Sequence, residues 1–228
     1  MVRKAWLIVM SIIAACPRPT CAQTVQTLPE VDVYYRLNSA AQVYFQAKGT
    51  REGGAPVTAE IGPSLDICFK RLRQLIHISR FDRDKSKEQL LVFSVGYRYL
   101  PYPEAPPVNR LEPYAVINIP TKGALLISDR NRFDLDWSMG NFSWHYRNRP
   151  TIEWPRRIGH YHFSPYASAE FWYTSQYSKW STTSLFAGSI FPIGKHVDFN
   201  PYYEHENNTG QAPNQQLNQL GLMLNLWF

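Results

Sequence analysis

The chain has 228 residues and a formal net charge of +6, from 24 Lys and Arg residues against 18 Asp and Glu residues. Three of the basic residues lie within the first 18 positions, so the remainder carries only about +3. This mild charge does not indicate a nucleic-acid-binding protein, and the sequence contains no nucleic-acid recognition motif. No segment after residue 16 has the ~20 consecutive apolar residues of a membrane helix, but membrane-spanning strands escape that test because their lipid-facing residues alternate.

Residues 1–22 have the pattern of a secretory signal peptide. Two basic residues precede an apolar stretch over residues 5–15, and Thr20-Cys21-Ala22 supplies a cleavage site. Residues 13–16 form a rival lipoprotein box, which would place a lipid on Cys16. Cleavage after Ala22 leaves residues 23–228 as one barrel domain with Cys68 as its lone cysteine, so we expect no intramolecular disulfide.

Apolar and polar residues alternate with a period of two along nearly all of the mature chain, and no helical period competes over any long window. Eleven stretches predict strands, at residues 31–37, 43–48, 57–67, 91–99, 114–119, 127–137, 142–154, 161–173, 185–191, 197–206 and 219–228. Short links at residues 38–39, 121–123 and 193–195 contrast with long links at residues 100–112, 175–183 and 207–216. Links of two lengths are typical of an all-β, antiparallel up-and-down barrel in the outer membrane.

The strand count is the weak point of this prediction, because bacterial single-chain barrels have an even number of strands. We therefore expect about twelve strands, with ten as the alternative. The additional strand would lie near Leu75 to Arg80, or before Val31. The basic link over residues 70–88 is either a solvated loop or a patch that touches lipid phosphates.

The last ten residues place four leucines and the terminal Phe228 on one face, which resembles the closing strand that directs barrels to the outer membrane. Trp144 and Trp154 share a face, and ten residues of a tilted strand span roughly 25 Å along the barrel axis. Tyr161 and Tyr173 repeat the pattern. We interpret these five aromatic residues as lipid-facing girdles at the two membrane surfaces; a soluble periplasmic barrel is the alternative.

Six phrases resemble the bacterial domain of unknown function 2490, which groups with outer-membrane barrels. They lie at residues 62–66, 95–99, 128–132, 146–149, 165–171 and 201–205. The resemblance spans about residues 28–228. It implies a barrel fold and no catalytic residues, because the family has no agreed activity.

Arginines dominate the face expected to line the lumen. Arg130 and Arg132 on one strand should lie beside Arg147 and Arg149 on the next, and Arg98 adds to the group. Fixed positive charges on a pore wall attract anions. This pattern predicts an anion filter in a narrow, porin-like channel for small anionic solutes.

A closed barrel is the competing interpretation, because carboxylates face the same lumen. Glu153, Glu170 and Glu204 are among them, and a narrow barrel filled with Arg–carboxylate pairs would have only a structural or assembly role. A lipid-modifying enzyme is a third class, since His162 and Ser164 share a face, but two same-face neighbours are too far apart for nucleophilic catalysis. We therefore expect no enzyme, metal site or cofactor. Expected partners are outer-membrane lipids of a Gram-negative-type bacterium and the barrel-assembly machinery, which would bind the C-terminal strand.

Overall fold

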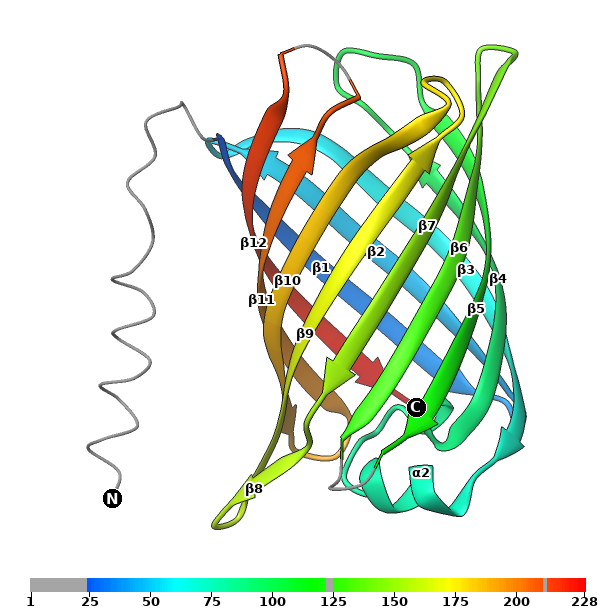
Figure 1. Cartoon of the computed structure of the whole chain (residues 1–228), viewed down its shortest axis with the longest axis vertical. Coiled ribbons are helices and arrows are strands. Elements are labelled where there is room, and N and C mark those ends of the chain that lie inside the picture. The colour runs from blue at the N-terminus through cyan, green and yellow to red at the C-terminus, as the bar shows by residue number, and fades with distance from the viewer. Residues whose placement is uncertain (1–23, 122–124, 211–212) are drawn as a thin grey trace.

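The computed structural model describes residues 24–121, 125–210 and 213–228, which form a closed β-barrel with a short helical segment at one end (Figure 1). The expected signal peptide and the rival lipid site at Cys16 lie outside the described residues. The strands are β1 (Thr24–Arg36), β2 (Ala41–Glu52), β3 (Ala55–Arg71), β4 (Gln89–Leu100), β5 (Val108–Pro120), β6 (Leu126–Ser138), β7 (Asn141–Glu153), β8 (Arg156–Ile158), β9 (Tyr161–Thr174), β10 (Lys179–Ile193), β11 (Val197–Asn208) and β12 (Gln215–Trp227).

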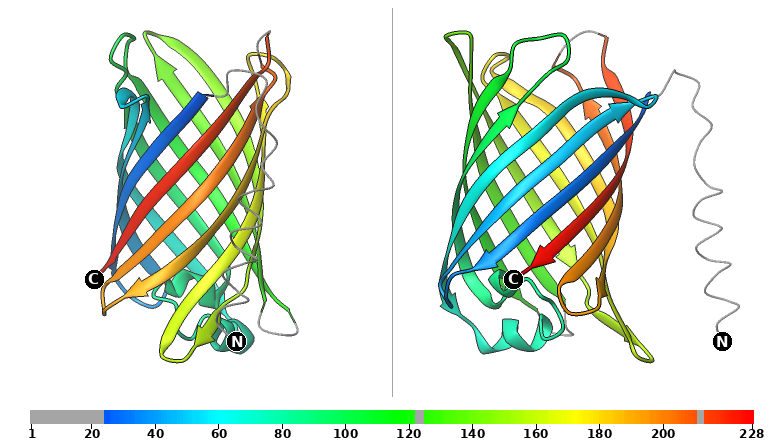
Figure 2. Two further views of the ribbon diagram at one scale, coloured as in Figure 1. Left: turned by 90° about the vertical axis from the view of Figure 1, so that its left-hand side faces the viewer. Right: turned by 180° about the vertical axis from the view of Figure 1, so that it is seen from behind.

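The barrel wall consists of eleven strands, β1–β7 and β9–β12, each hydrogen-bonded to its neighbours in the sequence. All these neighbours are antiparallel, but the closing pair is not: β1 and β12 run in the same direction (Figure 2) and pair from Thr24 with Leu217 to Tyr34 with Trp227. An odd number of up-and-down strands forces this arrangement, because the first and last strands then point the same way.

The total of about twelve strands is therefore confirmed, but the twelfth strand is not part of the wall. It is β8, a three-residue strand that pairs only with the start of β9. The eleven stretches of alternating residues correspond one to one to the wall strands, and the rule of an even strand number does not hold for this wall. The predicted additional strand near Leu75 to Arg80 is wrong.

That segment instead forms α2 (Arg73–Ile78), followed by the short 3-10 helix η1 (Lys85–Glu88). Leu75 and Ile78, three residues apart, lie on one face of α2 and pack with Leu126 at the end of the barrel. The helix forms because this face has a wall residue to pack against. None of the helices among the described residues is long and apolar enough to cross a lipid bilayer.

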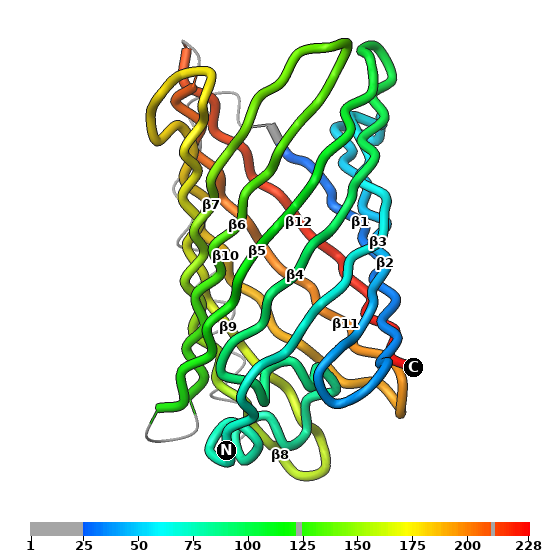
Figure 3. Tube along the Cα trace, turned by 90° about the vertical axis from the view of Figure 1, so that its right-hand side faces the viewer, coloured from blue at the N-terminus to red at the C-terminus, as the bar shows by residue number. Residues whose placement is uncertain are grey.

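The links predicted to be short lie at the end of the barrel that carries the C-terminus, and those predicted to be long lie at the other end (Figure 1). Link length nevertheless does not separate the two ends, because both ends carry short and longer links. Two tight turns interrupt the pattern at the far end, at Gly53-Gly54 and Met139-Gly140, where all four residues have positive φ. The longest link, residues 72–88, is also an exception because it lies at the C-terminal end, across the mouth of the barrel (Figure 3). We call residues 72–88 the cap.

The polarity of the barrel is inverted relative to a soluble protein. Among the described residues, 36 large hydrophobic side chains are exposed, while the buried residues comprise seven hydrophobic and 29 polar or charged ones. The last strand is representative: Leu220, Leu222 and Leu224 are exposed, whereas Gln219 and Asn225 are buried. The apolar face therefore points outward, and the polar face points into the lumen.

Candidate functional site in the barrel lumen

The five arginines predicted to form a filter all lie on the lumen face, on β4, β6 and β7. The antiparallel register of β6 and β7 places Arg130 opposite Arg149 and Arg132 opposite Arg147. The four guanidinium groups therefore share one patch of wall, as the alternation of the two strands predicts. Arg98 lies two strands away on β4.

None of these arginines presents an unpaired charge to the lumen. Glu170 on β9 receives three of them, with nitrogen–oxygen distances of 3.1 Å to Arg130, 3.1 Å to Arg147 and 3.0 Å to Arg149. Asp134 lies 2.6 Å from Arg132 and 3.0 Å from Arg147. Arg147 thus joins the two carboxylates into a single cluster.

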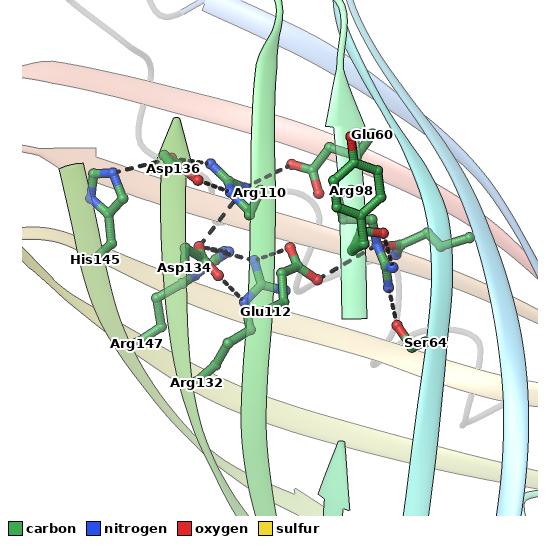
Figure 4. Close-up of polar contacts among 12 residues, drawn as sticks. Glu60, Ser64, Arg98, Arg110, Glu112, Arg132, Asp134, Asp136, His145 and Arg147 are labelled. Carbon is green, nitrogen blue, oxygen red and sulfur yellow. Dashed lines mark hydrogen bonds and ion pairs between the residues drawn. The ribbon is translucent and has the colours of Figure 1, made fainter. Parts of the chain in front are cut away.

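The cluster extends toward β3 and β4 through further ion pairs (Figure 4). Glu112 lies 3.3 Å from Arg132 and 3.5 Å from Arg98. Arg110 on β5 binds Asp136 at 2.7 Å and lies 3.6 Å from Glu60 on β3. We call this set the charge network: Arg98, Arg110, Arg130, Arg132, Arg147 and Arg149 with Glu60, Glu112, Asp134, Asp136 and Glu170.

Arg98 is completely buried and donates hydrogen bonds to backbone carbonyl oxygens of the wall. The ladder between β3 and β4 is interrupted at Gly62 and Pro63, where proline has no N–H to donate. Arg98 Nη1 donates to the carbonyl oxygens of Pro63 and Tyr97, both at 2.9 Å, and therefore satisfies acceptors at the interruption. Gly62 is needed there because a Cβ would lie 2.0 Å from the Tyr97 carbonyl oxygen.

The charge network fills the lumen at its level. Arg98, Asp134 and Glu170 are each 0 % exposed and Glu112 is 1 % exposed, although all four side chains point inward. Barrels of about eight strands are filled by side chains and those of sixteen leave a channel. In this eleven-stranded barrel, the burial of these inward-facing side chains indicates tight packing at the level of the network.

The cap is held at the C-terminal end of the barrel by charged contacts with the wall. Arg83 forms an ion pair with Asp198 on β11 and donates to the backbone of the β10–β11 turn. Lys87 lies 2.8 Å from Glu153 on β7 and 2.6 Å from Asp82 within the cap. The ring of Phe81 stacks on His162 of β9, with centroids 3.8 Å apart. The basic link is therefore not simply a solvated loop: Arg83 and Lys87 are held against the wall, whereas Arg71, Arg73 and Arg80 are exposed.

Between the cap and the charge network lies a cavity of about 380 Å³, which we call the chamber. Eight carboxylates and six basic side chains line it, along with several aromatic rings. Four of the basic side chains are network arginines already paired with carboxylates, and a fifth is Lys87. The surplus charge of the chamber is therefore negative.

The remaining predicted residues occupy the expected faces. Glu153 holds the cap, and Glu204 faces the lumen at 6 % exposure with no ion pair within 4 Å among the described residues. The girdle aromatics point outward at the two ends of β7 and β9, where Trp144 and Tyr173 stack at 5.7 Å. Trp154, Tyr161 and Phe228 are exposed at the C-terminal end.

His162 and Ser164, the two residues weighed for catalysis, each have another neighbour. His162 is stacked on Phe81, with ring centroids 3.8 Å apart, and Ser164 interacts with Glu153. Among the described residues, no group of three or more His, Cys, Asp or Glu side chains is arranged to hold a metal ion. Cys68 is a free, half-buried thiol.

Sequence reasoning missed Arg110 and Glu112, which it assigned to a long loop. The alternation of Arg110, Glu112 and Tyr114 with Leu111 and Pro113 was a usable signal, but Pro113 breaks the strand pattern. The structure begins β5 at Val108 and omits the Glu112–Pro113 step from its β5–β6 pairing. Arg83 and Lys87 were missed because nothing in a basic link indicates that it folds back onto the barrel.

Comparison with known proteins gives one family. Residues 87–217 match the family model described as Protein of unknown function (DUF2490). This match, over more than half of the chain, confirms the family that the six phrases indicated. No curated protein matches the chain.

Proposed function

The chain belongs to the DUF2490 family of proteins of unknown function, and we propose that it is an outer-membrane barrel whose lumen is a closed chamber and not a diffusion pore. One observation carries this proposal: every arginine of the charge network is paired with a carboxylate, and most of the network is buried, with Arg130 and Arg149 partly exposed to the chamber. Residues that attract anions in an open pore are thus engaged with each other.

The outward face supports insertion in a membrane. Exposed Leu, Val, Ile, Phe, Tyr and Trp side chains cover the wall, and closure satisfies the backbone polar groups that lipid cannot. The C-terminal Phe228 extends the closing pair, since its N–H donates to Tyr34 at 2.9 Å and its carbonyl accepts from Arg36 at 3.0 Å. These features support the outer membrane of a Gram-negative-type bacterium as the location, with recognition of β12 by the assembly machinery.

Fractionation of cells tests the location. The protein should sediment with outer-membrane markers, resist extraction by urea and migrate as a compact band on a gel unless boiled. Release with the periplasmic fraction would instead support the soluble barrel and overturn the membrane proposal.

Two barriers in series separate the ends of the barrel, namely the cap and the charge network. Each barrier alone should stop ions, because each fills the lumen at its own level. Arg83→Gln with Lys87→Gln releases the cap from the wall, and Arg147→Gln with Glu170→Gln breaks the centre of the network. Neither pair of substitutions by itself should open the barrel.

Potassium chloride flux from protein-containing vesicles tests the closure. We expect no leak from the native protein or from either double variant, and a leak only when the four substitutions are combined. A leak from the native protein would overturn the closed chamber. It would favour the narrow porin-like channel, whose filter would then be the chamber-facing Arg130 and Arg149.

The proposal includes no enzymatic step, and it assigns the protein no nucleic acid partner and no cofactor. Small anionic solutes belong to the alternative channel only. The lipid-modifying alternative gains no support from the site, because the ring of His162 is stacked on Phe81 of the cap.

A further inference from the structure

The chamber has a corner of buried acidic and amide oxygens that lack donors. Asp32 on β1 is 4 % exposed, and its Oδ1 has no hydrogen-bond partner in the described part of the protein. Asn225 on β12 is its register partner, is 7 % exposed, and also has an Oδ1 without a partner there. Both residues line the chamber. Two neighbouring acceptors thus face a cavity with no donor to meet them.

This corner is also short of positive charge. Across residues 24–121, 125–210 and 213–228, no Lys, Arg or His nitrogen lies within 4 Å of an Asp32 oxygen, and its other oxygen accepts only from Tyr34 at 3.3 Å. Asp66, another chamber carboxylate, accepts from the neutral donors Gln42 at 2.8 Å and Tyr114 at 3.1 Å. Lys48 lies opposite Glu30 in the β1–β2 register and acts on Asp32 only at longer range. Burying a carboxylate without a cation is costly.

A rigid apolar wall adjoins these oxygens. The rings of Tyr44, Tyr34 and Trp227 form a stack, with centroid distances of 5.1 Å and 4.0 Å, and all three line the chamber. Trp227 is fixed by its indole N–H, which donates to Asp198 at 2.8 Å, and Asp198 is in turn paired with Arg83 of the cap. The stack therefore offers a preorganised surface for the carbon skeleton of a ligand.

The arrangement of the acceptor oxygens indicates whether a metal ion or an ammonium group fits the chamber. The described carboxylates do not converge in the groups of three or more that a metal ion needs. An ammonium group instead carries three rotatable donors, which can reach acceptors that lie apart. Its alkyl chain can pack against aromatic rings, and a volume of about 380 Å³ is within the range of small-molecule pockets.

We propose that the chamber binds a small aliphatic amine, with its ammonium group between Asp32 and Asn225 and its carbon chain along the Tyr44–Tyr34–Trp227 stack. The inference rests on the closed chamber proposed above and names the class of ligand that this chamber holds. An amine would enter by transient release of the cap contacts, while the charge network still separates the two ends of the barrel. It reverses the charge preference expected from the arginines alone, since those arginines are already paired and the free acceptors are acidic.

Calorimetric titration of the full-length protein in detergent tests the proposal, with butylamine and 1,4-diaminobutane as probes. Both amines should give saturable binding, while butanol and butyrate, which lack the positive charge, should give none. Losing charge-assisted hydrogen bonds should make Asp32→Asn bind the amines roughly ten- to a hundredfold more weakly. Glu204→Gln, a buried lumen carboxylate outside the chamber lining, should bind like the native protein.

Loss of amine binding in Asp32→Asn could also result from misfolding, so a second measurement uses a different variant. Quenching or enhancement of tryptophan fluorescence by the amines should be lost in Trp227→Phe, which keeps the aromatic stack. Absence of saturable amine binding to the native protein, equal affinity in Asp32→Asn, or tighter binding of butyrate would overturn the inference. Because titration in detergent needs no membrane, a barrel that leaks salt but binds amines would overturn only the closed chamber, and a tight barrel that ignores amines only this inference.

Discussion

Glu170 is the position where the charge network is most vulnerable. This fully buried carboxylate on β9 holds three guanidinium groups, at 3.1, 3.1 and 3.0 Å. Glu170→Gln keeps the size of the side chain but removes the charge that three arginines share. Arg130, Arg147 and Arg149 would then face one another inside the barrel with one carboxylate fewer.

The expected loss of stability follows from this geometry. At an effective dielectric constant of about 20, each contact near 3 Å contributes about 5 kcal/mol of attraction before the cost of desolvation. Desolvation offsets most of that attraction, and removal of one partner from a buried ion pair costs about 3–5 kcal/mol. We expect Glu170→Gln to lower the unfolding free energy by about 3–5 kcal/mol, because the variant leaves three arginines without the carboxylate that they share.

Urea titration of the protein refolded in lipid vesicles measures this loss through tryptophan fluorescence. Glu204→Gln is the matched control, since Glu204 is as buried as the network but pairs with no basic group within 4 Å among the described residues. Combining Glu170→Gln with Arg149→Gln should recover part of the stability. A loss below about 1 kcal/mol for Glu170→Gln, within the range of an exposed pair, would refute the claim that the network is buried and dry.

Three further predictions concern the wall, the cap and the C-terminus. Gly62→Ala should abolish the compact band on an unboiled gel, because its Cβ would collide with the Tyr97 carbonyl, whereas Gly49→Ala, whose nearest neighbouring atom is 3.6 Å away, should fold. Burial raises the pKa of Asp84 in the cap to about 6, so its protonated form favours the folded state and stability should fall as the pH rises from about 4 to about 6. Asp84→Asn should flatten that slope in urea titrations across this range; an unchanged slope would contradict the buried position. Deleting Phe228 should lower the outer-membrane yield, measured as the heat-modifiable fraction, and an unchanged yield would argue against a role in assembly.

The alternation of side chains was enough to predict the wall. All eleven strands were recognised because this barrel repeats one simple pattern, apolar outward and polar inward, in every wall strand. Four strands, β1, β2, β5 and β10, were predicted at about half their length. In β5 a proline interrupts the pattern, and in β10 the first residues are Lys179, Trp180 and a run of hydroxyl side chains.

Long-range closure was beyond the reach of the sequence. The parallel pairing of β1 with β12 depends on the total number of wall strands. The alternation pattern indicated the correct number, eleven, but we expected an additional strand because bacterial barrels usually have an even number. The cap illustrates the same limit, because α2 is only six residues long and its apolar face has meaning only against Leu126 of another strand.

The charge network shows why the filter and the closed barrel remained alternatives on sequence grounds. Arginines that face each other on adjacent strands were predictable from the alternation of side chains. Most of their carboxylate partners lie on other strands, although Asp134 shares β6 with Arg132. Glu170 reaches Arg130 across β7, and Arg110 reaches Glu60 across β4. Whether an arginine binds a solute or a neighbouring carboxylate depends on distances between side chains on different strands. These distances cannot be read from the residues around each arginine in the sequence.

Current through a planar lipid bilayer containing the native protein, recorded under a potassium chloride gradient, tests the closed chamber most directly. We expect a silent bilayer, with insertion verified by the heat-modifiable band of protein recovered from the same preparation. Discrete current steps with an anion-selective reversal potential would contradict the closed chamber and return the lumen arginines to the role of a filter.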